Sequence, residues 1–423
     1  MNKKEIPKKI IFQKCNINNI YFLFYAIISF INIFIGYNFK LFEEGSNKNI
    51  LCLPVKIFND LYIQNLSDFL AIIPHLIRKR LLKKKQEKIS SVEIEGTKDS
   101  EDSKLIYNDK NISITNKKKK TILLYCIIVG ILDFFEKFAL ILYFIIFTDK
   151  EFDVNSFSCV VPFEIICQFI CSFIILKIHF YKLQYFSLFL NLGIFIIILI
   201  IDIIYYSKND ETIWRLFFFY IFNVIFYSIE YSLGKKIFLY GFISVYLLII
   251  IKGSVVLILS LLLSLITFLV NKDIFIRMGF FFKKSKYIWL FIAKIFSSFF
   301  YTMINWLIID KFSPNYLPLS LLIYEFCYFI IELIYDPKII EDCKWDFYIR
   351  IILYLISFIG VMIHNEIVVI NICNLGSDTK YFLDLEVKNE ELFANTDNPE
   401  IIKRFDSLVE MPDDEQYNEN DES

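Results

Sequence analysis

Ten long apolar stretches fill most of the sequence between Asn19 and Asn371. A helix that crosses the roughly 30 Å hydrocarbon layer of a membrane needs about 20 apolar residues, because each residue adds about 1.5 Å. The 423-residue chain is 56% hydrophobic and 18% aromatic, which is more apolar surface than a water-soluble fold hides. We therefore expect an all-α polytopic membrane protein whose chemistry lies in the few polar residues inside these stretches.

The stretches predict ten transmembrane helices. The second is the weakest, because polar residues interrupt it and Pro74 is expected to kink it. An even number of spans places both termini on the same side of the membrane. The predicted spans are 19–36, 58–77, 121–147, 159–178, 183–206, 214–233, 241–269, 287–309, 315–335 and 347–371.

The charges of the connecting segments predict the orientation, because Lys and Arg concentrate in cytoplasmic loops. Residues 78–120 carry fourteen Lys and Arg against seven Asp and Glu, so we place this loop, the N-terminus 1–18 and the C-terminal tail in the cytoplasm. Loop 271–286 has five basic residues and falls outside, against the rule. Either it is an interfacial amphipathic helix or one span is wrong. A plasma membrane and an endomembrane both fit.

Polar, weakly hydrophobic composition predicts disorder in two segments, 86–118 and 394–423. The basic run Arg78–Lys85 directly follows a predicted span. It acts there as a positive-inside anchor or as a site for anionic lipid. Because basic residues beside spans are explained by topology, we expect no nucleic-acid partner. The expected partners are the lipid bilayer, a small-molecule solute and a second copy of the chain in a homodimer.

An internal repeat relates the third and fourth spans to the eighth and ninth. FALILYFIIFTDKEF, which closes the third span, resembles FFYTMINWLIIDKFSP in the eighth, and PFEIICQFICSFIIL resembles LLIYEFCYFIIELI. An offset of five spans reverses the orientation, and inverted repeats are typical of transporters. We predict two inverted five-helix repeats, 19–210 and 211–375, with an acidic, largely disordered tail at 376–423.

This arrangement resembles the drug/metabolite transporter superfamily, which includes EamA-like proteins and the nucleotide-sugar transporters of solute-carrier family 35. YSIEYSLGKKIFLYGFISVYLLIIIKG, from Tyr227 to Gly253, is similar to the sixth and seventh spans of such proteins. HNEIVVINICNLGSDTKYFLDLE, from His364 to Glu386, is similar to their end. The resemblance covers about residues 19–390 and implies transport, with the substrate open. The long basic loop 78–120 and the basic outside loop depart from the family pattern.

Charged side chains inside spans are expensive, so we expect them to face the bundle interior or a wet cavity. The third span places Asp133, Glu136 and Lys137 on one helical face, and Asp133 and Lys137 can neutralise each other. Similar polar stripes occur in the fourth, sixth, eighth and ninth spans. In the eighth, interhelical hydrogen bonding is the alternative to the wall of a pathway. The alternative for Glu230 is snorkelling into water at the end of the sixth span, and for Glu164 and Glu332 it is solvation near span ends. The candidate substrate-binding residues are Asp133, Glu136, Lys137, Glu230, Lys252, Tyr301, Asn305 and Glu325.

Lys252 lies in mid-span and needs a carboxylate or an anionic ligand. Glu136, Glu230 and Glu325 are its candidate partners. Lysines in a cavity favour a solute with phosphate or carboxylate, whereas three or more acids favour a cation or a proton-coupled step.

We expect alternating-access transport of a small polar metabolite, either an anionic, nucleotide-sugar-like molecule or another organic solute. The alternative is a non-transporting scaffold or receptor that acts through its cytoplasmic loop and tail. The sequence shows no metal-binding pattern, phosphate loop or nucleophile elbow, so we expect neither an enzyme nor a cofactor.

Overall fold

The computed structural model describes residues 10–12, 18–44, 53–96, 116–146, 160–178, 180–206, 212–241, 243–270, 285–335 and 345–370. These residues are mainly helical. The helices are α1 (Asn18–Glu44), α2 (Leu53–Phe69), α3 (Ile72–Gly96), α4 (Asn116–Ile146), α5 (Val160–Leu176), α6 (Lys182–Tyr206), α7 (Thr212–Gly241), α8 (Val245–Val270), α10 (Ser285–Lys311), the short 3-10 helix η3 (Pro314–Tyr316), α11 (Leu317–Tyr335) and α13 (Trp345–His364).

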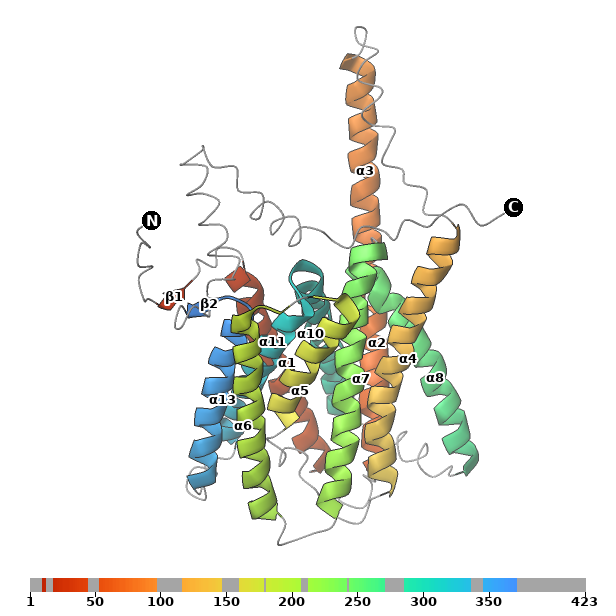
Figure 1. The fold of residues 1–423 in the computed structure, drawn as a ribbon. Helices are drawn as coiled ribbons and strands as arrows, with labels where there is room; N and C mark the ends of the chain where they lie inside the picture. The colour runs from red at the N-terminus through yellow and green to blue at the C-terminus, as the bar shows by residue number, and fades with distance from the viewer. Residues whose placement is uncertain are drawn as a thin grey trace, which may run out of the picture.

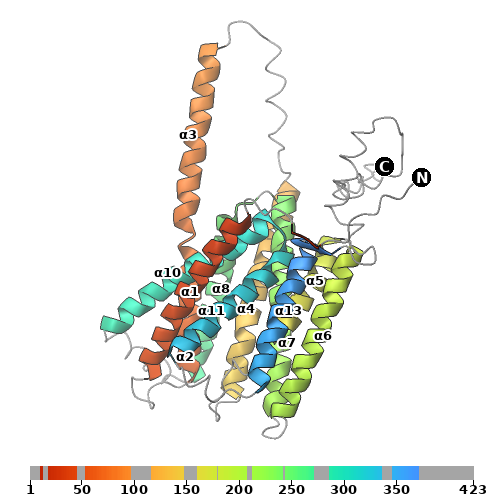
Figure 2. The ribbon, with the colours of Figure 1, turned by 90° about the vertical axis from the view of Figure 1, so that its left-hand side faces the viewer.

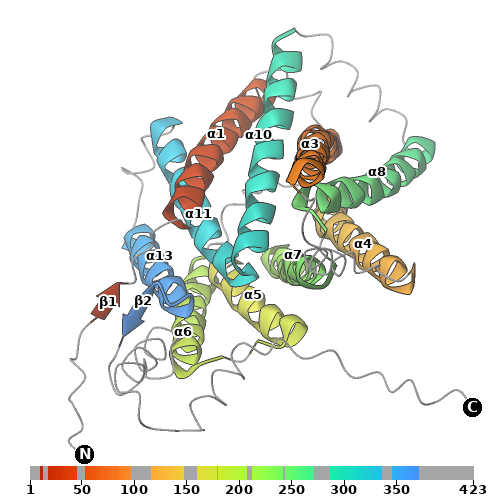
Figure 3. The ribbon, with the colours of Figure 1, turned by 90° about the horizontal axis from the view of Figure 1, so that it is seen from above.

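The helices other than α3 stand side by side in one bundle, and α3 projects far beyond it (Figures 1 and 2). Two short strands, β1 (Ile10–Phe12) and β2 (Val368–Ile370), pair antiparallel at the end of the bundle from which α3 projects (Figure 1). Seen along the bundle, α7 and α10 lie near the centre, and α6 and α13 form one edge (Figure 3).

The bundle exposes apolar side chains and buries polar ones. Leu269 and Ile204 are 71% and 66% exposed, whereas Asn65 and Ser187 are fully buried. Within the described residues, five helices contain segments long and apolar enough to cross a membrane: Tyr21–Asn38, Lys182–Ile204, Val245–Leu269, Ser285–Lys311 and Pro314–Tyr335. Apolar surface outside and polar groups inside suit a protein whose solvent is lipid.

The second predicted span, 58–77, is wrong in its extent. α2 ends at Phe69, and a turn at residues 70–71 separates it from α3. Pro74 does not kink a continuous helix. It lies in the first turn of α3, where proline is tolerated because the first N–H groups of a helix have no intrahelical partner.

Other predicted boundaries also move. α3 continues to Gly96, so residues 86–96 are helical where composition predicted disorder, because Lys, Gln and Glu are good helix formers that extend an existing helix. α7 runs to Gly241 through the predicted loop 234–240. α13 ends at His364, and residues 368–370 pair with 10–12 as strands, so the fold is not purely helical.

Several predictions fall on residues outside the described ranges. They concern most of the N-terminal segment 1–18, the loop residues 97–115, the basic loop residues 271–284 and the acidic tail 371–423. The cytoplasmic side of the bundle therefore stays a prediction from the loop charges.

Close helix contacts occur at small residues, as in membrane bundles. The buried indole ring of Trp306 on α10 lies over Gly234 on α7, and it packs against Tyr231 and Phe238 with ring centroids 4.9 and 6.0 Å away. A Cβ atom on Gly234 would collide with this ring. Gly234 therefore sets the distance between α7 and α10 at the centre of the bundle.

We expect Gly234→Ala to destabilise the protein by about 1–3 kcal/mol, because the added methyl group overpacks the Trp306 contact. The matched control is Gly193→Ala on α6, where nothing lies within 4 Å of the added carbon. Because Ala is the better helix former, the control should be neutral or slightly stabilising. Denaturant unfolding in mixed micelles measures both. Equal effects of the two substitutions would contradict this packing.

Candidate functional site

The centre of the bundle contains one buried ammonium group surrounded by carboxylates. Lys252 Nζ on α8 lies 3.1 Å from an oxygen of Asp133 on α4, 3.5 Å from Glu230 on α7 and 3.9 Å from Asp68 on α2. All four side chains are at most 3% exposed. Lys137, one turn after Asp133, lies 2.6 Å from its other oxygen. Four helices thus meet at a single ion cluster.

Two glycines allow these helices to approach. A Cβ on Gly253, next to Lys252, would lie 2.6 Å from the Cβ of Asp68. A Cβ on Gly130 of α4 would lie 2.8 Å from Val255 and 3.1 Å from the carbonyl oxygen of Lys252. Any larger residue at either position would push α2 or α4 away from α8. The sequence therefore brings the carboxylates to Lys252 by placing glycine at both helix crossings.

A polar cavity of about 310 Å³ adjoins the ion cluster. Seven helices contribute to its wall. The residues that line it are Gln64, Asp133, Glu136, Glu164, Asn223, Val224, Tyr227, Tyr231, Lys252, Tyr301, Thr302, Asn305, Leu321, Tyr324 and Glu325. A cavity of this size is at the lower end of the range for small-molecule sites.

The eight predicted site residues fall in this one region. Six of them line the cavity: Asp133, Glu136, Lys252, Tyr301, Asn305 and Glu325. The other two contact these residues, since Glu230 pairs with Lys252 and Lys137 with Asp133. The expected neutralisation of Asp133 by Lys137 is present as an ion pair.

Sequence reasoning missed two acidic residues. Asp68 is one of the polar residues that interrupt the second predicted span, and it lies in the last turn of α2 with a carboxylate oxygen 3.9 Å from Lys252 Nζ. Glu164, for which solvation near a span end is the alternative, lines the cavity. Of the three acids proposed as partners of Lys252, Glu230 is one, and Asp68 and Asp133 complete the cluster.

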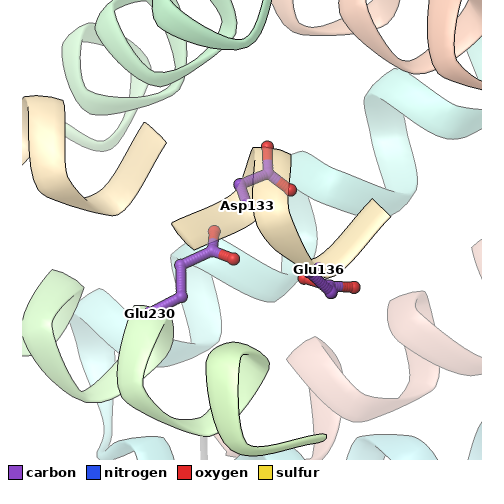
Figure 4. Close-up of side chains that lie close together, drawn as sticks. All are labelled: Asp133, Glu136 and Glu230. Atoms are coloured by element: carbon purple, nitrogen blue, oxygen red, sulfur yellow. The ribbon is translucent and has the colours of Figure 1, made fainter. Parts of the chain in front are cut away.

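Three of the carboxylates converge closely enough to hold a cation. Oxygen atoms of Asp133, Glu136 and Glu230 lie within 4.8 Å of one another (Figure 4). Carboxylate oxygens are the ligands that hard metal ions prefer. However, Lys252 already lies between two of the three, so a metal ion at this point would face an ammonium group. The residues at this end of the cavity form an ion cluster that already contains a cation, the ammonium group of Lys252.

The chain matches no protein-family model, and no curated protein matches it. The class of protein is therefore defined by the fold and the site. It is a helical protein with several helices that can cross a membrane and a polar, ion-containing cavity at the centre of the bundle.

We expect Lys252→Met to lower the free energy of unfolding by about 3–5 kcal/mol, because it leaves buried carboxylates without their counter-charge. The control is Lys311→Met, whose ammonium group is 3.6 Å from Asp310 but 55% exposed. An exposed pair contributes at most about 1 kcal/mol. Denaturant unfolding in mixed micelles separates the two variants, and a loss at Lys252 no larger than that at Lys311 argues against the cluster.

Proposed function

We propose that the chain is a polytopic membrane transporter that moves a small polar solute through the central cavity by alternating access between two five-helix halves. The observation that carries this proposal is the polar cavity beside a buried ion cluster, because such groups are costly in a membrane unless they serve a pathway. A scaffold or receptor that acts through its loops requires no such cavity.

The packing of the helices supports two equivalent halves. Two sets of contacts join the proposed halves. In one set, α4 packs on α7 and α8, and α5 packs on α7. In the other set, α10 packs on α1 and α2, and α11 packs on α1. Exchanging α1, α2, α4, α5 and α6 for α7, α8, α10, α11 and α13 converts one set into the other. Three further pairs, α2 with α8, α5 with α11 and α6 with α13, are exchanged into themselves, whereas the contact of α7 with α10 has no equivalent of the same extent between α1 and α4.

The sequence supports the same relation. Glu164 and Glu325 lie 161 positions apart, and the same interval separates Asp149 from Asp310. Glu164 is on α5 and Glu325 on α11, which are equivalent helices under this exchange. Both line the cavity. Under the proposal, the solute site therefore lies at the interface between the repeats, where such transporters bind their substrates, and the chain resembles drug/metabolite transporters in this respect.

Alternating access predicts that the cavity is reached from both sides of the membrane. We expect Thr302→Cys, in a full-length chain whose nine native cysteines are replaced, to react with a membrane-impermeant maleimide added to either face of sealed vesicles. The control Ser357→Cys, buried on α13 and hydrogen-bonded to Asn191 on α6, should react from neither face. Mass spectrometry of the labelled protein measures both.

Labelling of Thr302→Cys from one face only would contradict alternating access. Labelling from neither face would favour the scaffold alternative, because the cavity would then be sealed from both solutions.

A further inference from the structure

We infer that the solute is a small organic cation that carries an ammonium group, bound in the part of the cavity lined by Glu136 and Glu164. This inference rests on the proposed function and narrows its substrate class. It departs from the expectation that the lysines of the cavity recognise an anionic solute.

The lysines are already used by the protein. Lys252 is surrounded by the carboxylates of Asp68, Asp133 and Glu230, and Lys137 contacts Asp133. A phosphate or carboxylate group that approached Lys252 would have to displace one of these acids or share the ammonium with three of them. The ion cluster is therefore a poor anion site.

The acids exceed the bases around the cavity. Among the described residues, no lysine or arginine forms an ion pair with Glu136 or Glu164. Glu136 shares a hydrogen bond with Glu230 and is attracted by both lysines, so the excess negative charge is spread over the whole group of acids. Buried carboxylates in excess of their counter-charges are costly in a bundle surrounded by hydrocarbon, so the excess needs a proton or a cation. Among the described residues of the cavity and the ion cluster, six carboxyl groups face two ammonium groups: Asp68, Asp133, Glu136, Glu164, Glu230 and Glu325 against Lys137 and Lys252.

A second observation, an unpaired buried oxygen in the same lining, is consistent with a ligand in the cavity. Asn305 is 3% exposed and lines the cavity, and its Oδ1 atom accepts no hydrogen bond from any described residue. A buried amide oxygen without a donor is costly, and an N–H or O–H group of a ligand would satisfy it.

The rest of the wall suits an ammonium group. Tyr227, Tyr231, Tyr301 and Tyr324 line the cavity. The chain contains 47 phenylalanines and 26 tyrosines, yet no phenylalanine is among the described lining residues, so composition does not explain the tyrosines. Aromatic faces attract organic cations, and carboxylates combined with aromatic rings recognise alkylammonium groups. A hard metal ion instead depends on a shell of oxygen ligands.

The test compares a cation with its neutral isostere. Full-length protein in lipid nanodiscs is titrated with radiolabelled choline, and unlabelled 3,3-dimethyl-1-butanol, putrescine and inorganic phosphate are used as competitors. We expect choline to bind, putrescine to compete, and the neutral alcohol and phosphate to fail at tenfold higher concentration. The double variant Glu136→Gln/Glu164→Gln should weaken choline binding at least tenfold. The control Asp310→Asn, an acid at the end of α10 outside the cavity lining, should leave it unchanged.

Three results would overturn the inference: no binding of choline or putrescine, equal competition by the neutral alcohol, or unchanged affinity in the double variant. Competition between choline and its neutral isostere for the wild-type protein tests the cation site even if the double variant fails to fold. Uptake of choline into proteoliposomes separates the two proposals. Binding of choline without uptake would support the cation site and contradict transport. Labelling of Thr302→Cys from both faces without cation binding would support transport and contradict the cation site.

Discussion

The fold depends on the compensation of Lys252, an ammonium group held on a helix that is otherwise among the most apolar in the chain. Lipid offers it no solvation, so its partners must come from the protein. Asp68, Asp133 and Glu230 supply them from three different helices, and this requirement brings α2, α4 and α7 together around α8. The need to compensate the ammonium group of Lys252 therefore explains why these four helices meet.

Charge alone does not hold such a bundle, because apolar side chains gain little by leaving lipid for a protein interior. Close packing provides the remaining attraction, and it needs small residues where helices cross. Gly130 and Gly253 allow α4 and α2 to reach α8, and Gly234 receives the ring of Trp306. The centroid of the same ring lies 5.6 Å from Lys252 Nζ, so this indole takes part both in the close packing of α7 and α10 and in the surroundings of the buried ammonium group.

Sequence reasoning located the helices well and their ends poorly. The length of an apolar stretch indicates where a helix can lie in lipid, but it does not fix where the helix ends. α3 continues to Gly96 because its residues favour a helix, and α13 stops at His364, shortly before strand β2. That strand pairs with residues 10–12, more than 350 positions away, which no local pattern predicts. The same limit applies to the site. Individual charges within spans were recognisable, but the choice of Asp68 as a partner of Lys252 depends on a crossing of distant helices.

Under the proposed repeat, the two halves share a scaffold but not a charge distribution. The interval of 161 positions that relates Glu164 to Glu325 also relates Asp133 to Lys294 and Glu136 to Ser297. Lys294 and Ser297 both donate hydrogen bonds to Asn32 Oδ1 of α1, a neutral amide, where the other half has its ion cluster. Among the acids that line the cavity, Glu164 on α5 and Glu325 on α11 are alike in both halves. Under the proposed transport, a cation bound beside these two glutamates would have one carboxyl group in each half, so it would keep an acidic partner whichever half moved.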